Sequence, residues 1–522
     1  MRWIADDPDP ATRSELQRVL AAAMTGDEAA RADLADRMSG PLRFGTAGLR
    51  GPVRAGPAGM NVAVVRRATA GLAAWLTARG HGGGTVVVGR DARYGSEAFA
   101  AATAEVFAGA GFAVRVLPAP LPTPVLAFAV RELGAVAAVQ VTASHNPPAD
   151  NGYKVYLGDG AQLAPPSDAE IEAAITAAPP AVSVPTGGAV DTVDVTPSYL
   201  DRVARLPRGT ARGLRVALTP MHGVGGETAV LALRAAGFTD VHVVAAQAAP
   251  DPAFPTVAFP NPEEPGAVDA LLALASECGA DLAVALDPDA DRCALAVPGR
   301  DGTWRMLSGD ETGVLLGDHL LRSGGHDDPL VATTVVSSQM LRSVAAAYGA
   351  RYAETLTGFK WIVRGGPGLV YGYEEALGYC VDPGAVRDKD GIAAAVLACD
   401  LAAGLQVQGR DLLDRLDELA AAHGVHRTEQ ISLRMAPAAR DAAVERLRAA
   451  PPAGWEGSRP APDVLVLRRA GERVVVRPSG TEPKLKAYLE VVEPPGEDLA
   501  ASRAAAEERL SALRGEVRAL LG

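Results

Sequence analysis

Short apolar runs that end in polar loops constrain the fold of this chain more than any other feature. Ala135–Val141, Asp281–Leu286 and Leu369–Tyr371 each have the composition of a buried strand, and each is followed at once by a polar loop. Segments of helical periodicity separate these runs, for example the helix predicted from Asn61 onward. Strands that alternate with helices indicate parallel sheets, so the pattern predicts the α/β class.

The length of the chain requires several domains, because 522 residues exceed what one hydrophobic core can organise. The strand–helix pattern repeats three times, as architecture rather than as sequence identity. The last hundred residues differ: short strands surround one helix over Asp441–Ala449, and a long helix closes the chain, which indicates a smaller α+β domain. We therefore predict four domains, with boundaries at 1–208, 209–305, 306–425 and 426–522.

Charge and cysteine content exclude several classes of protein. With a formal net charge of −12, the chain is a poor candidate for a general binder of nucleic acid or of an anionic membrane. No apolar run is long enough to span a bilayer, and the acidic N-terminus lacks the apolar core of a signal peptide. The four cysteines form no C-x-x-C pair, which favours reduced thiols over zinc or disulfides. We expect a cytoplasmic protein.

The loop Thr142–Pro147 follows the first apolar run directly, so Ser144 lies just past the carboxyl end of a predicted strand. Ligands of open α/β sheets bind at such strand ends. A serine hydroxyl there is a candidate nucleophile that requires activation, and His145 is its neighbour in the chain. The alternative is a Ser/Asn turn that only caps the strand. Pro147, Pro148, Asn151 and Gly152 predict that the loop continues beyond the serine.

Two basic residues lie in loops of the same predicted domain. Arg50 closes the glycine-rich stretch Arg43–Gly51, which is either a functional loop or a plain turn with a solvated arginine. Lys154 follows the Ser144 loop and is either a general acid/base or a surface lysine.

The loop after Asp281–Leu286 carries the most specific metal signal. Asp287, Asp289 and Asp291 stand two residues apart, so their carboxylates can converge on one cation around a kink. Oxygen ligands without nearby His or Cys favour Mg²⁺, Mn²⁺ or Ca²⁺ over zinc. An EF-hand lacks the required Gly and distal Glu spacing. A solvated acidic turn and a phosphatase with an aspartyl nucleophile are alternatives, the latter weakened by the proline after Asp287.

The stretch Arg477–Lys486 has the chemistry of a phosphate cradle. An arginine offers a bidentate fork, a glycine allows close approach of backbone N–H groups, and hydroxyls and lysines add donors. These groups belong to Arg477, Ser479, Gly480, Thr481, Lys484 and Lys486. An ordinary basic turn is the alternative.

Glu374 and Glu375 form a carboxylate pair suited to sugar hydroxyls. A nucleophilic hydroxyl, a divalent cation, a phosphate cradle and this pair together indicate phosphoryl transfer on a sugar phosphate.

In these motifs the chain resembles the α-D-phosphohexomutase superfamily, the phosphoglucomutase/phosphomannomutase enzymes. Thr142–Pro147 resembles the phosphoserine loop, Asp287–Arg292 the magnesium loop, Gly372–Gly378 the sugar-recognition loop and Arg477–Thr481 the phosphate loop. The motifs occur in the family's order along essentially the whole chain. The resemblance implies three similar mixed-sheet α/β domains plus a smaller C-terminal α+β domain around a central cleft. In chain order these would be the phosphoserine, metal-binding, sugar-recognition and phosphate-binding domains.

The resemblance also implies roles for single residues. Ser144 would be the phosphorylated serine, and its phosphate would hold Mg²⁺ together with Asp287, Asp289 and Asp291. The remaining residues fall into a catalytic set around Ser144, namely Arg50, His145 and Lys154, and a substrate-binding set. We expect the substrate-binding set to contain Arg292, Thr357, Gly358, Lys360, Glu374, Glu375, Arg477, Ser479, Gly480, Thr481 and Lys486.

The implied reaction consists of two phosphoryl transfers. Phosphoserine gives its phosphate to a sugar monophosphate, and the resulting bisphosphate turns around and returns its other phosphate to Ser144. Glucose 1,6-bisphosphate or a similar sugar bisphosphate is the expected activator, and glucose 1-phosphate is the leading substrate by resemblance. The sequence carries no signal for an oligomeric state.

One position departs from the family pattern. The common sugar loop reads Glu-x-Ser, whereas Ala376 stands two places after Glu374. With Thr357–Trp361, this loop is most similar to the branch that holds phosphopentomutases and glucose-1,6-bisphosphate synthases. Phosphomannomutase or phosphopentomutase specificity, or bisphosphate synthesis, therefore remain alternatives. Two competing classes are a sugar-phosphate-binding protein without turnover and a serine-phosphorylated hydrolase, although the eight histidines are too scattered for the metal cluster of such a hydrolase.

Overall fold

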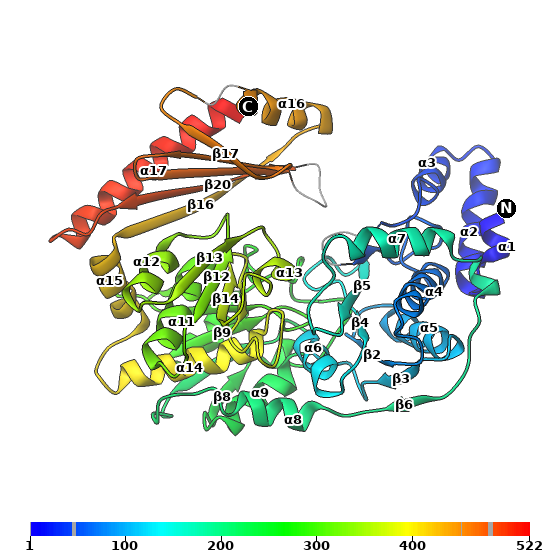
Figure 1. The fold of residues 1–522 in the computed structure, drawn as a ribbon, viewed down its shortest axis with the longest axis horizontal. Coiled ribbons are helices and arrows are strands. Elements are labelled where there is room, and N and C mark those ends of the chain that lie inside the picture. Colours follow the sequence, from blue (N-terminus) through cyan, green and yellow to red (C-terminus); the bar gives the residue numbers. More distant parts are fainter. Residues whose placement is uncertain (1, 44–47, 450–451, 479–483, 522) are drawn as a thin grey trace. The chain divides into compact units, whose positions relative to one another are not determined.

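The computed structural model describes residues 2–43, 48–449, 452–478 and 484–521 (Figure 1). The chain divides into two compact units, and each consists of separate segments of sequence. Unit 1 comprises Met1–Pro207, Arg212–Met306 and Asp382–Cys399. Unit 2 comprises Arg208–Ala211, Leu307–Val381 and Asp400–Gly522.

The N-terminal extension of unit 1 is helical, with α1 (Arg2–Asp6), α2 (Pro10–Met24) and α3 (Glu28–Arg37). The helical stretch ends and restarts at Thr25–Asp27. Gly26 has a φ of 100°, which terminates α2, and the side chain of Asp27 accepts a hydrogen bond from the N–H of Ala30, which caps α3. Capping residues thus separate α2 from α3.

The first sheet of unit 1 has six strands in the order β1-β5-β4-β2-β3-β6. The central strands β2, β3 and β4 are parallel, while β5 runs antiparallel to both β4 and β1. The strands are β1 (Leu49–Pro52), β2 (Thr85–Arg90), β3 (Ala113–Val116), β4 (Ala137–Val141), β5 (Asp150–Leu157) and β6 (Val190–Thr192). Its helices are α4 (Val62–Ala78), α5 (Ser96–Gly109), α6 (Thr123–Glu132) and α7 (Ser167–Ala177).

The predicted start of α4 is confirmed, because the side chain of Asn61 accepts a hydrogen bond from the N–H of Val64 at 3.0 Å and caps the helix. Every residue of β4 is buried, as its apolar sequence predicts. The core of this domain includes Val86, Val88, Val139 and Phe107. Burial on both faces therefore explains why this strand reads as a continuous apolar run.

The prediction that Asn151 and Gly152 belong to the loop after Ser144 is wrong, because β5 begins at Asp150 and contains both residues. They are paired with Gly51 and Arg50 of β1. A Cβ on Gly152 would lie 2.4 Å from the carbonyl oxygen of Thr142. The glycine is therefore present for close backbone approach inside a sheet, and turn chemistry was the wrong interpretation.

The second sheet, also in unit 1, has the order β11-β10-β9-β7-β8. The strands β7, β8 and β9 are parallel, and β10 and β11 extend the sheet as antiparallel strands. The strands are β7 (Arg215–Thr219), β8 (Asp240–Val243), β9 (Leu282–Leu286), β10 (Cys293–Pro298) and β11 (Trp304–Met306). The helices of this part of the chain are α8 (Thr196–Val203), α9 (Gly226–Ala235) and α10 (Asp269–Cys278).

The third sheet belongs to unit 2 and has the order β13-β12-β14-β15, with only β15 antiparallel to its neighbour. Its strands are β12 (Leu330–Thr334), β13 (Arg351–Thr355), β14 (Leu369–Glu374) and β15 (Gly378–Cys380). The helices of this stretch of the chain are α11 (Gly309–Ser323), α12 (Met340–Ala347), α13 (Phe359–Ile362), α14 (Gly391–Gln406) and α15 (Leu412–His423). Of these, α14 belongs to unit 1 as far as Cys399. The predicted strand at Leu369 is three residues longer than its apolar stretch and ends at Glu374.

The C-terminal part of unit 2 is a five-stranded antiparallel sheet in the order β16-β20-β19-β18-β17. Its strands are β16 (Val425–Arg434), β17 (Glu456–Ala461), β18 (Val464–Arg469), β19 (Glu472–Pro478) and β20 (Lys484–Glu493), and its helices are α16 (Pro437–Ala449) and α17 (Leu499–Leu521). Residues of the sheet and both helices form one core. The predicted loop Arg477–Lys486 is shorter than expected, because both of its ends belong to strands.

Three mixed-sheet α/β domains followed by an antiparallel α+β domain confirm the predicted fold class. The exact domain boundaries remain a prediction. Among the described residues, no helix combines the length and the apolar character needed to cross a membrane.

Candidate active site

Ser144 lies in the loop that joins β4 to β5, and this loop is held in a strained shape. Ser144 has a φ of 52°, in the left-handed region that a serine rarely adopts. The guanidinium of Arg93 stabilises this conformation, because it donates hydrogen bonds to the carbonyls of Ser144 at 2.7 Å, Asn146 at 2.6 Å and Pro147 at 2.9 Å. The fold therefore fixes the backbone that presents the serine hydroxyl.

The hydroxyl of Ser144 points at the acidic loop of the second sheet. Ser144 Oγ donates a hydrogen bond to Asp287 Oδ2 at 2.7 Å, and His145 Nδ1 lies 3.2 Å from the same Oγ. The serine and the aspartate are 143 residues apart in the chain. The candidate nucleophile, its histidine neighbour and the acidic loop thus lie together in unit 1.

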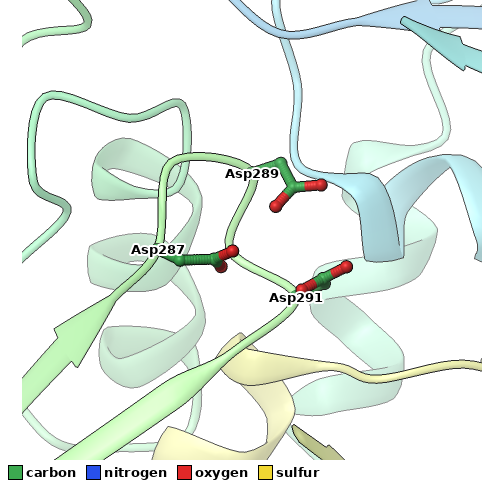
Figure 2. Close-up of side chains that lie close together, drawn as sticks. All are labelled: Asp287, Asp289 and Asp291. Carbon is green, nitrogen blue, oxygen red and sulfur yellow. The ribbon is translucent and has the colours of Figure 1, made fainter. Parts of the chain in front are cut away.

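Asp287, Asp289 and Asp291 lie in the turn between β9 and β10, with their carboxylates on one side of the turn (Figure 2). All three are fully buried, and one oxygen of each lies within 4.8 Å of the others. Ala290, between Asp289 and Asp291, has a φ of 55°, which kinks the turn. Within the described part of the chain, Asp289 Oδ1 and Asp291 Oδ1 are buried without a hydrogen-bond donor. An all-oxygen set with two unsatisfied anionic atoms fits a hard divalent cation.

Two lysines compensate part of this negative charge. Lys154 Nζ, from β5, lies 2.7 Å from Asp289 Oδ2 and 2.9 Å from Asp291 Oδ2. Lys389 Nζ lies 3.2 Å from Asp291 Oδ2. Lys154 is 3% exposed, so the interpretation of this residue as a surface lysine is wrong. Its placement in a strand directs its side chain across to the acidic turn.

Burial and neighbouring charges shift the pKa values of this cluster in different directions. Burial, followed by the charges of Asp289 and Asp291, raises the pKa of Asp287 well above its ordinary value. Burial opposes ionisation of Asp289 too, but the Lys154 ammonium and the hydroxyl of Thr123, which donates to Asp289 Oδ2 at 2.6 Å, hold its pKa below the ordinary value. At Lys154, burial lowers the pKa, but the charges of Asp289 and Asp291 outweigh it and raise the pKa above its ordinary value. The cluster therefore pairs an ammonium with two carboxylates beside a third, less acidic carboxyl group.

The charges nearest to His145 are positive, in contrast to the negative charges around Lys154. Burial and then the positive charges of Arg292 and Arg50 hold its pKa well below the ordinary value, which favours the neutral imidazole. Arg50, in β1, donates a hydrogen bond to Asn146 Oδ1 at 2.8 Å and so contacts the serine loop. Arg292 stands at the end of the acidic turn, and its Nη1 lies 3.9 Å from Glu263 Oε2. Both arginines supply positive charge beside His145, the neighbour of the serine.

Two further candidate residues of this region, Arg93 and Lys389, were not predicted from the sequence. Arg93 shapes the serine loop, and Lys389 contacts Asp291. Lys389 belongs to Arg387–Gly391, a charged run just before the apolar helix α14. This segment is also anchored on β5, because Asp388 Oδ2 accepts hydrogen bonds from Tyr156 Oη at 2.7 Å and from Gln162 Nε2 at 2.6 Å. The dense charge before an apolar helix was the signal that could have revealed it.

The predicted sugar-recognition residues lie in unit 2. Glu374 ends β14 and is 7% exposed, and Glu375 begins the turn to β15. Glu375 Oε2 accepts hydrogen bonds from Ser337 Oγ at 2.9 Å and from Thr334 Oγ1 at 3.2 Å. Burial and then the charge of Glu374 raise the pKa of Glu375 to about 7. The side chain of Glu375 is therefore held by the neutral hydroxyls of Ser337 and Thr334.

Thr357, Gly358 and Lys360 form the entry to α13. Gly358 has a φ of 113°, which only glycine adopts without strain. Lys360 is buried, with Nζ 5.7 Å from the ring centroid of Trp361. In the described chain, Thr357 Oγ1 is buried without a hydrogen-bond partner, so its hydroxyl remains available to a ligand.

Arg477 and Lys486 are cross-strand partners on β19 and β20 and flank the predicted phosphate loop. Ser479, Gly480 and Thr481, the rest of that prediction, lie outside the described residues. The structure therefore places one set of predicted residues together in unit 1, around Ser144, and a second set in unit 2.

Comparison with known proteins agrees with this architecture. Models of phosphoglucomutase/phosphomannomutase domains match in order: alpha/beta/alpha domain I at residues 41–181, domain II at 197–300, domain III at 308–422 and the C-terminal domain at 431–508.

Three relatives with curated names are similar over most of their length. A probable phosphomannomutase from Haemophilus influenzae is 43% identical over 453 residues, which cover 83% of this chain and 93% of the relative. A phosphopentomutase from Mus musculus is 31% identical, with 95% and 90% covered. A glucose 1,6-bisphosphate synthase from Homo sapiens is 30% identical, with 95% and 89% covered.

Among solved structures, a putative phosphomannomutase from Thermus thermophilus superposes with a TM-score of 0.71 at 27% identity, covering 91% of this chain and all of that one. Four domain matches in order, full-length relatives and this superposition lead to one conclusion. The chain belongs to the phosphoglucomutase/phosphomannomutase family of phosphosugar mutases, in the branch that includes phosphopentomutases and glucose 1,6-bisphosphate synthases.

Proposed function

We propose that this enzyme interconverts sugar 1-phosphates and sugar 6-phosphates through a phosphorylated Ser144, with glucose as the preferred sugar. The observation that carries the proposal is the direct hydrogen bond from Ser144 Oγ to Asp287 within the aspartate cluster. A hydroxyl that is held rigidly against a cation-binding carboxylate set has the geometry needed for phosphoryl transfer.

In the proposed first transfer, a hydroxyl oxygen of the sugar monophosphate attacks the phosphorus of phosphoserine. The bond between phosphorus and Ser144 Oγ breaks, and the proton of the attacking hydroxyl passes to a basic group of the site. The sugar bisphosphate then turns around, and Ser144 Oγ attacks the phosphorus of its other phosphate. The bond between that phosphorus and the sugar oxygen breaks, the serine proton passes to a basic group of the site, and the sugar oxygen takes up a proton, which releases the isomeric monophosphate. His145 and Lys154, with Arg50 nearby, are the proposed groups for proton transfer and charge stabilisation.

Asp287, Asp289 and Asp291, together with the phosphate on Ser144, would hold Mg²⁺. When bound, this cation supplies positive charge to the phosphoryl oxygens during transfer. The lysines that contact Asp289 and Asp291 hold the carboxylates in place and balance the charge that remains.

Unit 2 carries the proposed recognition chemistry. Glu374 and Glu375 accept hydrogen bonds from sugar hydroxyls, and Thr357, Gly358 and Lys360 add a polar contact and a positive charge. Arg477 and Lys486, with Ser479, Gly480 and Thr481, bind the phosphate that is not transferred. Arg292 contributes a further phosphate contact from unit 1.

Ala376, where the common sugar loop has serine, and the names of the relatives favour other substrates as the alternative to glucose 1-phosphate. Mannose or pentose 1-phosphate as substrate, or synthesis of glucose 1,6-bisphosphate, would use the same Ser144 chemistry. The proposed bisphosphate intermediate also makes glucose 1,6-bisphosphate the natural activator, since it phosphorylates Ser144 directly.

Intact-protein mass spectrometry after incubation with glucose 1,6-bisphosphate tests the mechanism. We expect one added phosphate, mapped by peptide analysis to Ser144, and its loss on addition of glucose 1-phosphate or glucose 6-phosphate. A coupled assay with glucose, mannose, ribose and deoxyribose 1-phosphates then ranks the sugars. Release of inorganic phosphate at the rate of substrate loss would indicate a hydrolase, and binding without turnover would indicate a sugar-phosphate-binding protein.

A further inference from the structure

The turn at the end of β12, Val335–Ser338, contacts the sugar-recognition loop through one side chain. Ser337 Oγ donates a hydrogen bond to Glu375 Oε2 at 2.9 Å and accepts one from the Glu375 N–H at 3.3 Å. Thr334 Oγ1 lies 2.8 Å from Ser337 Oγ and also donates to the carboxylate. Both the backbone and the side chain of Glu375 are therefore held by the hydroxyl of Ser337.

The backbone of the same turn is held from the C-terminal domain. Arg473, on β19, donates from Nη1 to the carbonyl of Val335 at 3.1 Å and from Nη2 to the carbonyl of Ser337. Arg473 is 4% exposed. Ser337 thus contacts the C-terminal domain through its carbonyl and the sugar loop through its hydroxyl.

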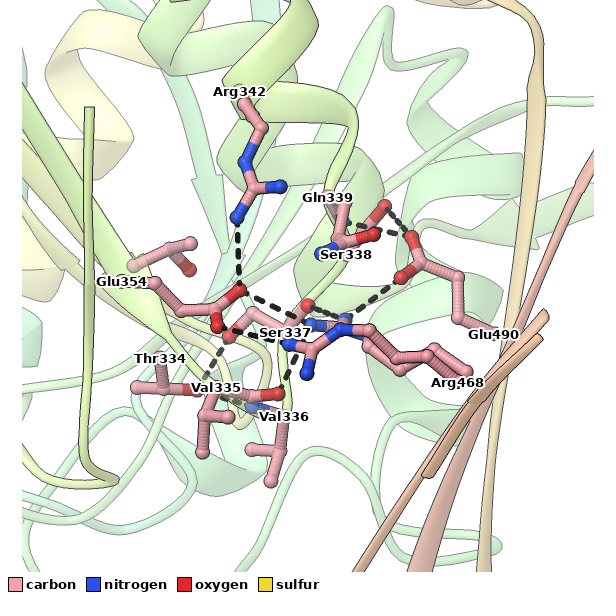
Figure 3. Close-up of polar contacts among 12 residues, drawn as sticks. Thr334, Val335, Val336, Ser337, Ser338, Gln339, Arg342, Glu354, Arg468 and Glu490 are labelled. Atoms are coloured by element: carbon pink, nitrogen blue, oxygen red, sulfur yellow. Dashed lines mark hydrogen bonds and ion pairs between the residues drawn. The ribbon is translucent and has the colours of Figure 1, made fainter. Parts of the chain in front are cut away.

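Two carboxylates fix the guanidinium of Arg473. Glu490, its cross-strand partner on β20, lies 2.7 Å from Nη2, and Glu354 lies 3.3 Å from Nη1. Glu490 in turn accepts hydrogen bonds from Ser338 Oγ at 2.9 Å and from the N–H of Gln339 at 2.7 Å, as Figure 3 shows. Two carbonyls and two carboxylates are served at once by the planar fork of arginine, whereas lysine offers only three donors on a single nitrogen.

Apolar side chains surround this contact. Val335 and Val336 pack with Val475 and Tyr488 of the C-terminal sheet in one buried cluster. Successive side chains on a strand alternate between faces, so Arg473, Val475 and Arg477 project from the same face of β19. The strand that carries Arg477, the proposed phosphate ligand, therefore also supports the turn behind the sugar loop.

We propose that Arg473 is a positioning residue for sugar recognition: by holding the Ser337 turn it fixes Glu375, so that the seating of the C-terminal domain sets the sugar selectivity. The inference rests on the proposed function, which assigns Glu374 and Glu375 to the sugar hydroxyls. Arg473 itself contacts no substrate in this account.

The test is Arg473→Lys in the full-length enzyme, assayed with glucose 1-phosphate and ribose 1-phosphate. Lysine keeps the charge, but its single ammonium cannot serve both carbonyls and both carboxylates at once. We expect the ratio of the two kcat/KM values to change about three- to tenfold, the range expected when one hydrogen-bonded reader is displaced. Arg415→Lys is the matched control, since Arg415 pairs with buried Asp318 in the same unit at 2.6 Å and does not contact the turn. The control should leave the ratio unchanged.

A double-mutant cycle distinguishes positioning from general support. In a Glu375→Ala background, Arg473→Lys should no longer change the sugar ratio, because its effect passes through Glu375. An undiminished effect in that background overturns the proposal, as does an Arg473→Lys variant that loses thermal stability without any change in the ratio.

Ser337→Ala keeps the test decisive if Arg473→Lys does not fold. This variant retains the carbonyl that Arg473 contacts and removes only the hydroxyl that holds Glu375. It should change the sugar ratio by a similar factor, and an unchanged ratio contradicts the inference. Failure of the proposed function has a different signature, since the wild-type enzyme would then show no mutase turnover and no phosphate on Ser144.

Discussion

Unit 1 and unit 2 hold their functional carboxylates in different ways. In unit 1, Asp289 and Asp291 contact the ammonium of Lys154, which keeps both ionised despite complete burial. In unit 2, Glu375 is held by the neutral hydroxyls of Ser337 and Thr334, and its pKa lies at about 7. Charged partners suit the proposed cation site of unit 1, whereas neutral partners suit the proposed exchange of hydrogen bonds with sugar hydroxyls in unit 2.

The comparison separates reaction chemistry from selectivity. Charges within hydrogen-bond distance in a buried site interact strongly, so substitutions in the unit 1 cluster should affect turnover of every sugar. Single neutral hydrogen bonds contribute about 0.5–1.5 kcal/mol, so substitutions in the unit 2 loop should change the ranking of sugars instead. Five experiments test this division, from the largest expected effect to the smallest.

Removal of the nucleophile should have the largest effect. We expect Ser144→Ala to lower mutase turnover more than about 10⁴-fold, equivalent to about 5.5 kcal/mol of barrier, because no hydroxyl other than that of Thr142 exists in the loop. Steady-state turnover with each sugar 1-phosphate measures the loss, and intact mass should show no phosphate on the variant. Near-normal turnover with any sugar would contradict the covalent mechanism.

Removal of the cation should affect all sugars equally. We expect EDTA to lower turnover by at least about 10³-fold and Mg²⁺ to restore it, because the aspartates and the phosphoserine leave a large uncompensated negative charge. Metal analysis of the treated protein confirms that it is metal-free. Full activity in the metal-free enzyme would show that the lysines alone satisfy the cluster.

Loss of the proposed phosphate anchor in unit 2 should change binding more than turnover. Arg477→Ala is expected to raise KM about 10- to 150-fold with little change in kcat, since a charge-assisted contact of about 1.5–3 kcal/mol is made both before and after transfer. Initial rates over a range of substrate concentrations separate the two parameters. A loss confined to kcat would assign Arg477 to the transferred phosphate.

Selectivity should be weak in the natural enzyme and stronger in one variant. Ala376 can neither donate nor accept a hydrogen bond, so we expect mannose or pentose 1-phosphates within about two orders of magnitude of glucose 1-phosphate in kcat/KM. Ala376→Ser restores the common Glu-x-Ser pattern and should increase the discrimination among sugars up to about tenfold. A preference above about 10⁴-fold in the wild-type enzyme would mean that other residues read the hydroxyls.

The smallest effect concerns pH and stability. The pKa of Glu375 is about 7 in the folded chain and has an ordinary value of 4.5. The folded state therefore holds the proton more tightly than the unfolded state, and this contribution to stability is lost as pH rises from about 4.5 through about 7. Glu375→Gln removes the titration, so the thermal midpoint of the variant relative to wild type should rise by about 2–4 °C between pH 5 and pH 8. If the difference in thermal midpoint between variant and wild type stays constant with pH, the pKa of Glu375 is not raised by folding.

The amino-acid sequence determined the elements and much of the chemistry of this protein. Apolar runs such as Ala137–Val141 and Leu282–Leu286 are strands because burial on both faces favours β-branched and small apolar residues there. The polar loops that follow them carry Ser144 and the three aspartates, because strand ends of an α/β sheet are where the chain can present side chains without breaking the core. Local sequence misled at Asn151 and Gly152. These residue types predict a loop, but both residues lie in β5 and pair with β1.

Only the tertiary structure decided which groups are partners. The hydrogen bond from Ser144 to Asp287 spans 143 residues, and the contact of Arg473 with the backbone of Ser337 spans 136. Neither Lys389 against Asp291 nor Ser337 against Glu375 follows from spacing along the chain. Residue types and local periodicity specify what each segment can do, whereas the distance between two segments depends on how the sheets and domains pack.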